Sequence, residues 1–292
     1  MISLVDKYSG LIPQSCVKSC YSQPPATIRV NTLKISRDEL INRLTNKGFK
    51  LVEHKAHPQA IKIIKQPFSI GATTEYLCGY YFVQDAASMI PVTELNPRPG
   101  DLVLDMCSAP GGKTTHLAEL MNDKGVIIAC DVDKQRLKAV KYSTQRMGFS
   151  NVVIYNINPA KLPGSLEFDK VLLDAPCSAE GTLYKNPKAL EKANYKQLII
   201  EQQRLIETAI KLLKKGGMLV YSTCTINPEE NELIVQHAVN QGMKLLKLET
   251  SAGSPGLTKF KGKELKPELS LTRRFYQLTD ETSGFFVARM IK

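Results

Sequence analysis

The sequence has few features that would place it in a membrane or an oxidising compartment. Its 292 residues include no apolar run approaching the ~18 residues of a membrane-spanning helix. The opening segment, MISLVDKYSG, lacks the basic and then apolar pattern of a signal peptide. The seven cysteines are odd in number and scattered, which is typical of reduced thiols and not of a disulfide framework. We therefore expect a cytoplasmic protein without a membrane anchor.

Patterns that bind metals are also scarce. The nearest pair of cysteines, Cys16 and Cys20, has no second pair and no histidine partner at the spacing of a zinc site. The four histidines are dispersed along the chain. We therefore expect no metal.

Acidic residues are outnumbered. The chain has 39 Lys and Arg against 28 Asp and Glu, a net charge of +11, and residues 1–80 hold +6 of this excess (11 basic and 5 acidic residues). A basic surface favours a polyanionic partner, with nucleic acid ahead of a membrane surface. A lysine-rich surface that is merely solvated has the same composition, so charge alone does not decide between these alternatives.

The most informative stretch is Leu102–Lys113, LVLDMCSAPGGK. It predicts a buried strand, a tight loop and then a helix, a turn that directs backbone N–H groups and a helix N-terminus at one ligand. A second apolar run, Val126–Cys130, ends in Asp131, 20 residues after Gly111. An acidic side chain at the tip of the second strand can accept both hydroxyls of a ribose. This combination favours a nucleoside cofactor over an ordinary strand–helix turn, although the loop lacks the full G-x-G-x-x-G pattern of NAD sites.

Strand and helix patterns alternate from this stretch onward. Strand patterns lie near 102–105, 126–130, 152–156, 170–173, 218–222, 244–248 and 285–290, with helical patterns near 113–121, 134–147, 197–214 and 229–240. Such alternation predicts an α/β fold with a mainly parallel, seven-stranded sheet and helices on both faces. Ligands bind outside the carboxyl ends of such strands, where Asp105, Asp131, Asp174 and Ser222–Cys224 fall.

A smaller unit precedes this domain. Strand patterns lie over 27–33, 51–52 and 60–64, and a capping box at Ser36 begins a helix that ends near Asn46. We expect residues 1–78 to hold an N-terminal segment and a small α+β unit, and 79–292 to form the larger domain. The small unit either carries single-stranded RNA or is a structural cap.

A long segment, 251–283, is rich in Gly, Pro, Ser and Lys. Segments of this length are usually functional or disordered. Its basic side chains are candidates for contacts with phosphates: Lys259, Lys261, Lys263, Lys266, Arg273 and Arg274.

Two cysteines follow predicted strands, Cys177 after Asp174 and Cys224 after Ser222. Either cysteine alone is more typical of a small buried apolar residue. Together, beside a carboxylate and a nucleoside cofactor, they suit methyl transfer to carbon 5 of cytosine. A thiolate that adds to carbon 6 makes carbon 5 nucleophilic toward a sulfonium methyl, and a carboxyl group that is kept protonated can donate a hydrogen bond to ring nitrogen 3.

Five motifs carry a resemblance to a known family: RVNTLK, VLDMCSAPGGKTTHLA, DKVLLDAPCSAEGT, YSTCTINPEENE and GFFVARM. Over residues 27–290 the chain resembles the RNA cytosine-5 methyltransferases of the Nol1/Nop2/Sun family. The resemblance implies a Rossmann-like class I methyltransferase domain, with residues 27–75 as an RNA-recognition-like module. It also implies S-adenosyl-L-methionine as the cofactor.

The resemblance further implies roles for individual residues. Cys224 would be the nucleophile, Cys177 would help to release the product, and Asp174 would lie between cofactor and target base. The residues implied to bind the cofactor are Cys107, Ser108, Ala109, Pro110, Gly111, Gly112, Lys113, Asp131, Arg136, Asn158 and Asp174.

Two positions depart from the family pattern. Asn158 stands where the family usually has an Asp that contacts the adenine amino group; its carbonyl can still accept but carries no charge. After Pro-Cys the family usually has Ser-Gly, whereas this chain has Ser178-Ala179. The change from Gly to Ala is small unless the position needs positive φ.

The substrate expected from the resemblance is tRNA, which compact archaeal members modify without an extra C-terminal domain. Ribosomal RNA is the alternative within the family. A non-catalytic RNA-binding or assembly factor that retains the fold is the alternative outside it. We expect a monomer.

Overall fold

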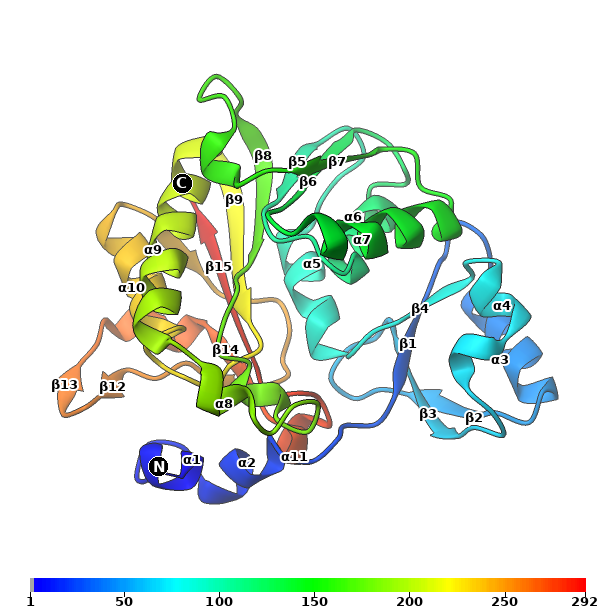
Figure 1. Ribbon diagram of the computed structural model, residues 1–292, viewed down its shortest axis with the longest axis horizontal. Coiled ribbons are helices and arrows are strands. Elements are labelled where there is room, and N and C mark those ends of the chain that lie inside the picture. The colour runs from blue at the N-terminus through cyan, green and yellow to red at the C-terminus, as the bar shows by residue number, and fades with distance from the viewer. Residues whose placement is uncertain (1–2) are drawn as a thin grey trace.

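A large mixed sheet forms the centre of the computed structural model, which describes residues 3–292 (Figure 1). Its strands are Leu102–Asp105 (β5), Val126–Asp131 (β6), Val152–Asn156 (β7), Phe168–Asp174 (β8), Leu213–Thr223 (β9), Lys244–Leu246 (β10), Ser254–Pro255 (β11), Arg273–Phe275 (β14) and Phe285–Ile291 (β15). Their order is β11-β14-β15-β9-β8-β5-β6-β7, and β10 also pairs with β15.

The sheet is parallel from β7 to β9, and β15 is antiparallel to β9. The path β7-β6-β5-β8-β9-β15-β10 confirms the expected seven-stranded, mainly parallel sheet. The short strands β11 and β14 extend it beyond β15 and were not expected, because they occupy the segment 251–283 that shows no strand pattern.

Helices cover both faces of the sheet (Figure 1). One face carries Ile90–Leu95 (α5), Gly112–Leu120 (α6) and Lys134–Met147 (α7), and the other carries Tyr195–Leu212 (α9) and Glu232–Asn240 (α10). The sequence explains this layering because successive side chains of a strand point to opposite faces. In β8, Leu172 packs in the cluster of Leu117, whereas Leu173 packs in the cluster of Ile206.

A second, four-stranded antiparallel sheet lies beside the first. It has the order β2-β3-β1-β4, from Thr27–Val30 (β1), Lys50–Glu53 (β2), Ala60–Lys65 (β3) and Tyr81–Val83 (β4), with helices Arg37–Asn46 (α3) and Thr74–Leu77 (α4). The hydroxyl oxygen of Ser36 accepts from the Glu39 N–H and begins α3, as the capping box predicts. Strand β4 extends this sheet past residue 78, where we expected the small unit to end.

Arg29 of β1 connects the small sheet to the large domain. Its guanidinium is fully buried, pairs with Glu119 at 3.1 Å and donates to the Gly112 carbonyl at 2.8 Å and to the Thr115 hydroxyl at 3.1 Å. Leaving a buried charge unpaired costs about 3–5 kcal/mol, so this contact holds the two sheets in one arrangement. The arginine of the RVNTLK motif therefore supports the start of α6 directly.

The first helices pack on the large domain and not on the small sheet. Leu4–Lys7 (α1) and Gln14–Ser19 (α2) share an apolar cluster with Leu183, Ile226 and Tyr276. They were not predicted, because four to six residues are too few to show helical periodicity. The remaining α-helices and strands of the described residues are Ala189–Lys192 (α8), Lys259–Phe260 (β12), Lys263–Glu264 (β13) and Gln277–Asp280 (α11).

One close backbone contact joins the loop after β8 to the start of β15. Gly181 donates its N–H to the Cys224 carbonyl, and Gly284 donates to the Gly181 carbonyl, both at 2.9 Å. A Cβ on Gly181 would lie 2.0 Å from the Gly284 carbonyl oxygen, so only glycine allows this approach. Within residues 3–292, no helix is long and apolar enough to cross a bilayer.

Candidate active site

The carboxyl ends of β5, β6, β8 and β9 surround a cavity of about 430 Å³. This is the edge at which the sequence predicts a ligand. Eight of the predicted residues line this cavity: Cys107, Ala109, Asp131, Arg136, Asn158, Asp174, Cys177 and Cys224. A second hollow of about 310 Å³ shares Cys107, Ala109, Asp174 and Cys224 with the first, so the two cavities meet at the thiol of Cys224.

The turn between β5 and α6 has the predicted conformation. Gly111 has φ of 103°, and a Cβ there would lie 3.0 Å from the Cα of Val140. Glycine is therefore required both for the dihedral and for the approach of α7. Gly111 lines neither cavity, whereas Ser108, Pro110, Gly112 and Lys113 line the second hollow, so the loop contributes more to that hollow than to the first cavity.

Asp131 is buried at the tip of β6. Its carboxylate accepts from the Ala109 N–H at 3.3 Å and from the Asp133 N–H at 2.9 Å. Arg136, an exposed side chain, approaches Asp131 at 3.6 Å and donates to the Ala109 carbonyl at 3.2 Å. These contacts attach the loop after β5 to the tip of β6 and leave the remaining lone pairs of the Asp131 carboxylate for a ligand.

Asn158 lies exposed at the edge of the same cavity. Its side-chain oxygen accepts from the Ala160 N–H at 3.0 Å and begins a short 3-10 turn, Pro159–Lys161. The amide carbonyl predicted to face an adenine is therefore already engaged with the backbone, with one further lone pair free.

Asp105 lies at the end of β5, beneath the loop. Burial is the main cause that raises its pKa to about 7, and the hydrogen bond from the Thr114 hydroxyl at 2.7 Å opposes the shift. Burial, and then the charge of Asp105, also raises the pKa of Cys107 well above its usual value. Cys107 is therefore an unreactive thiol that lines the cavity.

The sulfur atoms of Cys177 and Cys224 lie 3.5 Å apart, and both cysteines are free thiols. The hydrogen bond from Cys177 is the main cause that lowers the pKa of Cys224. Burial and the charge of Asp174 oppose this shift, and the positive charges of Lys113 and Lys185 add to it. The same hydrogen bond, together with burial, raises the pKa of Cys177 well above its usual value. The thiolate is the nucleophilic form, so these directions favour Cys224 as the attacking atom, and its role stays a prediction.

Asp174 lies between the two cavities and beside the thiols. Its two carboxylate oxygens accept from the Lys113 ammonium and from the Ser222 hydroxyl, each at 2.7 Å. The arrangement joins the loop after β5 to the ends of β8 and β9. It also places a carboxylate where the second hollow opens onto Cys224.

Two family models match the chain. A family model described as 16S rRNA methyltransferase RsmB/F matches residues 92–291, and one described as an RsmF/B-like ferredoxin-like domain matches residues 7–70. The chain belongs to the RsmB/F methyltransferase family. This membership confirms both the resemblance to the Nol1/Nop2/Sun enzymes and the expected α+β unit before the Rossmann-like domain.

Two curated relatives illustrate the range of the family. The 25S rRNA (cytosine-C(5))-methyltransferase nop2 of Schizosaccharomyces pombe is 39% identical over 280 residues, covering 92% of this chain and 46% of that protein. The tRNA (cytosine(72)-C(5))-methyltransferase of Pyrococcus horikoshii is 38% identical over 240 residues, covering 80% of this chain and 58% of that protein. The chain thus spans about half the length of the curated relatives it matches.

Solved structures agree over nearly the whole chain. A methyltransferase homologue from Pyrococcus horikoshii has a TM-score of 0.88 at 40% identity and covers 97% of this chain and 92% of its own. NSun6 from the same organism, solved with SFG, has a TM-score of 0.87 at 28% identity and covers 99% of this chain and 97% of its own.

Several lining residues of this RsmB/F family member were missed by sequence reasoning. Glu201 and Leu205 of α9 line the first cavity. The second hollow adds residues of β4, of the segment that follows it, of the loop after β8 and of the start of β15: Phe82, Val83, Gln84, Asp85, Ser88, Thr182, Lys185, Ser283 and Phe285. The position of Asp85 two residues after the YYFV run was the one available signal, and its carboxylate accepts from the Ser283 N–H at 3.0 Å.

One expectation about the basic residues of segment 251–283 is wrong. Arg274 was a candidate for phosphate contacts, but in this RsmB/F family member it is buried and paired with Glu232, so it is not accessible to a phosphate. Its basic neighbours Lys259 and Lys261 remain exposed, each in an ion pair with a glutamate. Across the described part of the chain, no group of three or more His, Cys, Asp and Glu residues could hold a metal ion.

Proposed function

We propose that the protein transfers a methyl group from S-adenosyl-L-methionine to carbon 5 of cytosine in RNA, with tRNA as the first substrate. The observation that carries this proposal is the pair of thiols 3.5 Å apart at the junction of two cavities. One cavity is of a size for a nucleoside cofactor, and the other is open to a base. A methyltransferase that modifies an amine has no need of a thiol nucleophile.

The residues around the first cavity suit the cofactor. Asp131 offers carboxylate lone pairs to ribose hydroxyls, and Asp174 offers a negative charge beside the methionine part. Beside this cavity, the Ser108 hydroxyl oxygen in the lining of the second hollow is buried and has no hydrogen-bond partner among the described residues, so a polar ligand group would satisfy it. When bound, S-adenosylmethionine supplies an electrophilic methyl group. NSun6, which was solved with SFG, has the same fold.

The thiols perform the covalent steps. Cys224 Sγ, as the thiolate, forms a bond to carbon 6 of cytosine, and the displaced electron pair makes carbon 5 nucleophilic. Once carbon 5 carries the methyl group, its proton leaves to a base, and the returning electron pair breaks the bond between Sγ and carbon 6. We assign assistance of this elimination to Cys177, which donates a hydrogen bond to the departing sulfur.

Asp174 and Lys113 complete the pocket for the base. The Asp174 carboxylate faces the second hollow, where it can hydrogen-bond the polar edge of cytosine. Lys113 and Lys185 line the same hollow, where their positive charges favour the thiolate and the charge that it delivers to the ring. The hollow also receives side chains of the small sheet, which supports a role for that sheet in binding the RNA.

Two relatives bear on the choice of RNA. The chain covers 58% of the length of the tRNA enzyme from Pyrococcus horikoshii and 46% of the length of the rRNA enzyme from Schizosaccharomyces pombe. These shares do not separate the two substrates, because the chain also covers 63% of ribosomal RNA small subunit methyltransferase F of Vibrio campbellii. We keep tRNA as the first substrate because the chain resembles compact members that modify tRNA, and rRNA is the alternative. The proposal includes a monomer in the cytoplasm, which agrees with seven free thiols.

The test is methyl transfer from labelled cofactor, followed by nucleoside analysis. Purified protein is incubated with unmodified tRNA or with rRNA transcripts, and with each RNA the Cys224→Ala variant serves as the control. The expected product is 5-methylcytidine in tRNA, absent with the variant. A product only in rRNA would move the substrate to the alternative. Binding of RNA without any methyl transfer would favour a non-catalytic factor.

A further inference from the structure

Two buried glutamates follow the catalytic cysteines, and neither belongs to the chemistry described above. Glu180 lies three residues after Cys177, and Glu230 lies six residues after Cys224. Both side chains are fully buried, yet neither lines the cofactor cavity or the second hollow. A buried carboxylate is costly in free energy unless several hydrogen-bond donors surround it.

Glu230 belongs to the loop after β9 and reaches into the loop after β8. One of its oxygens accepts from the Ser178 N–H at 2.9 Å and from the Gln202 amide at 3.0 Å. The other accepts from the Ser178 hydroxyl at 2.6 Å and from the Asn227 amide at 3.1 Å. Ser178 is the residue next to Cys177, so this carboxylate holds the backbone that carries the Cys177 thiol.

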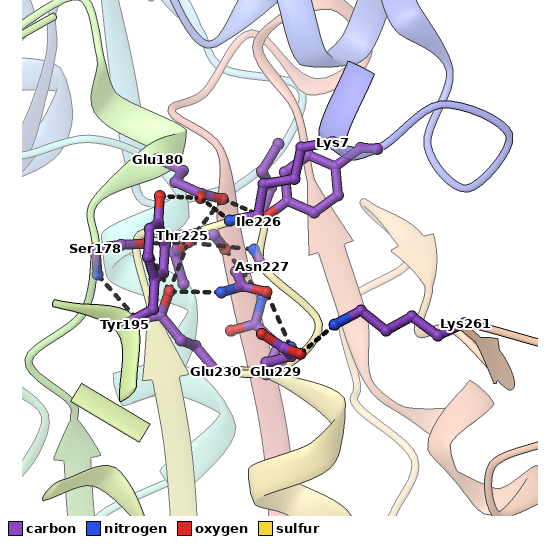
Figure 2. A network of polar contacts seen from close by, with 12 residues as sticks. Lys7, Ser178, Glu180, Tyr195, Thr225, Ile226, Asn227, Glu229, Glu230 and Lys261 are labelled. Carbon is purple, nitrogen blue, oxygen red and sulfur yellow. Dashed lines mark hydrogen bonds and ion pairs between the residues drawn. The ribbon is translucent and has the colours of Figure 1, made fainter. Parts of the chain in front are cut away.

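Glu180 makes the reverse connection, as Figure 2 shows. It belongs to the loop after β8, and one of its oxygens lies 3.4 Å from the hydroxyl of Thr225, the residue next to Cys224. The Thr225 hydroxyl has a shorter contact, 2.9 Å, with the hydroxyl oxygen of Ser178. Glu180 also accepts from Lys7 at 2.7 Å, from Tyr8 at 2.6 Å and from Tyr195 at 2.9 Å. Each cysteine loop thus contributes one buried glutamate to the other, and we call Glu180 and Glu230 the crossed glutamates.

We propose that Glu230, supported by Glu180, is a positioning residue that sets the separation of the two sulfur atoms and keeps the shared proton on Cys177. The geometry points to this role because the Ser178 N–H and O–H both end on Glu230, which leaves the Cys177 loop little freedom to move. A displacement of about 1 Å at a reacting group can cost about 100-fold in rate.

The charge of Glu230 supports the second half of the proposal. It is among the causes that raise the pKa of Cys177, after the hydrogen bond with Cys224 and burial. Other charged or titratable groups also face the thiol pair, and they include Asp174, Lys113, Lys185, Tyr221 and Cys107. Among these groups, the two lysines favour a negative charge on Cys224 and Asp174 opposes one. Glu230 disfavours a negative charge on Cys177. The proton of the pair is thereby directed to Cys177.

The test compares Glu230→Gln with Glu229→Gln in the full chain. Glu229 is the adjacent residue, is partly exposed and pairs with Lys261 at the surface, so its variant controls for a general effect of charge removal. In Glu230→Gln, an NH₂ group that cannot accept a hydrogen bond replaces one carboxylate oxygen. Donors face both positions, so part of the connection to Ser178 is lost. The first readout is the site and the pH dependence of alkylation by iodoacetamide, mapped on peptides by mass spectrometry.

Of the two cysteines at the site, we expect alkylation at Cys224 alone in the wild type and in Glu229→Gln, and at both in Glu230→Gln, with the reaction at Cys224 shifted to higher pH. The exposed Cys78 should be alkylated in all three proteins and serves as the internal reference. The turnover number for RNA methylation should fall about 100-fold in Glu230→Gln. The KM for RNA and the dissociation constant of the cofactor should both stay unchanged. A residue with only a general structural role would not exchange one alkylation site for two.

The proposal rests on the proposed function only for its kinetic readout, because alkylation needs no RNA. If Glu230→Gln matches Glu229→Gln in alkylation site, pH dependence and turnover, the positioning role is refuted. If the wild type methylates no RNA but the alkylation sites change as expected, the proposed function fails and the positioning role stands. If Glu230→Gln does not fold, Ser178→Ala removes only the hydroxyl bond, and the same appearance of Cys177 alkylation decides the question.

Discussion

The cofactor side of the site and the thiol side are built from contacts of very different range. On the cofactor side, the hydrogen bond between Ala109 and Asp131 joins residues 22 apart. On the thiol side, the bond between Ser178 and Glu230 joins residues 52 apart, and that between Tyr8 and Glu180 joins residues 172 apart. The cofactor side is mainly a strand–turn–helix feature, to which Arg29 adds a contact with Gly112 from 83 residues away. The thiol side requires four distant segments to come together.

The difference has an energetic meaning. Local contacts need little loop closure, so the cofactor side can form as soon as β5, α6 and β6 pack together. The thiol side closes long loops and buries two carboxylates, so it depends on the surrounding packing to hold its geometry. We therefore expect substitutions on the two sides to affect separate measurements, and the following predictions are ordered from the largest expected effect.

The largest effect is expected at the nucleophile. Cys224→Ala should lower the rate of methyl transfer by at least ~10⁴-fold, since no other group supplies the covalent step. Cofactor affinity, measured by titration calorimetry, should be unchanged. Cys177→Ala should instead accumulate a covalent adduct of protein and RNA, visible as a slow band on a denaturing gel. Normal turnover of Cys224→Ala would overturn the assignment of roles.

The next effect concerns pH on the cofactor side. The pKa of Asp105 is raised to about 7, whereas in the unfolded chain it has its ordinary value of 3.8. The folded state therefore binds more protons, and this carboxyl group lowers the free energy of unfolding as the pH rises from about 4 to about 7. Relative to Asp105→Asn, the wild type should lose roughly 2–3 kcal/mol between pH 5 and pH 8.

Urea denaturation of both proteins at the two pH values measures this difference. An equal dependence on pH in the wild type and in Asp105→Asn would show that Asp105 does not titrate in this range. Alkylation of Cys224 serves as the check on the thiol side, where we expect no difference between the two proteins.

Loss of the Asp131 carboxylate should weaken the cofactor and leave the thiols unchanged. A charge-assisted hydrogen bond contributes about 1.5–3 kcal/mol, so Asp131→Ala should raise the dissociation constant of S-adenosylmethionine about 10- to 100-fold. Asp133→Asn, two residues further and exposed, keeps its capping oxygen and is the control. Equal affinities of the two variants for S-adenosylmethionine would show that Asp131 does not bind the cofactor.

The smallest effect is a gain in stability on the thiol side. Ala179 has φ of 58°, the left-handed region that a residue with a Cβ disfavours by about 1–2 kcal/mol. Relief of this strain in Ala179→Gly should raise the free energy of unfolding by about 1 kcal/mol. The greater conformational entropy of glycine in the unfolded chain reduces this gain. Ala160→Gly, at an exposed position without positive φ, should instead lose stability. A loss in both would contradict this account.

The same contrast explains what the sequence could predict. The turn after β5, the acid at the tip of β6 and the cysteines after β8 and β9 all follow from strand patterns and their ends, because a parallel sheet brings those ends together. Glu180 and Glu230 could not be found, since a glutamate in a loop is normally exposed and nothing local marks these two as buried. Arg274 was misassigned to the surface for the same reason.

The departure at Ala179 shows how a sequence observation can become a structural one. The sequence poses the question of whether the position needs positive φ, and the dihedral answers that it does. For Asn158, the structure adds the hydrogen bond to Ala160 but leaves its contact with adenine a prediction.

The contact of Gly181 with Gly284 has a consequence for the order in which the protein acquires activity during synthesis. The ribosome makes residue 284 more than a hundred residues after Cys177, and β15 must insert beside β9 before the loop after β8 is held in place. The cofactor side can therefore assemble on a nascent chain while the nucleophile still lacks its ordered partner. While β15 is still inside the ribosome, the growing chain would bind the cofactor but could not modify the RNA molecules around it.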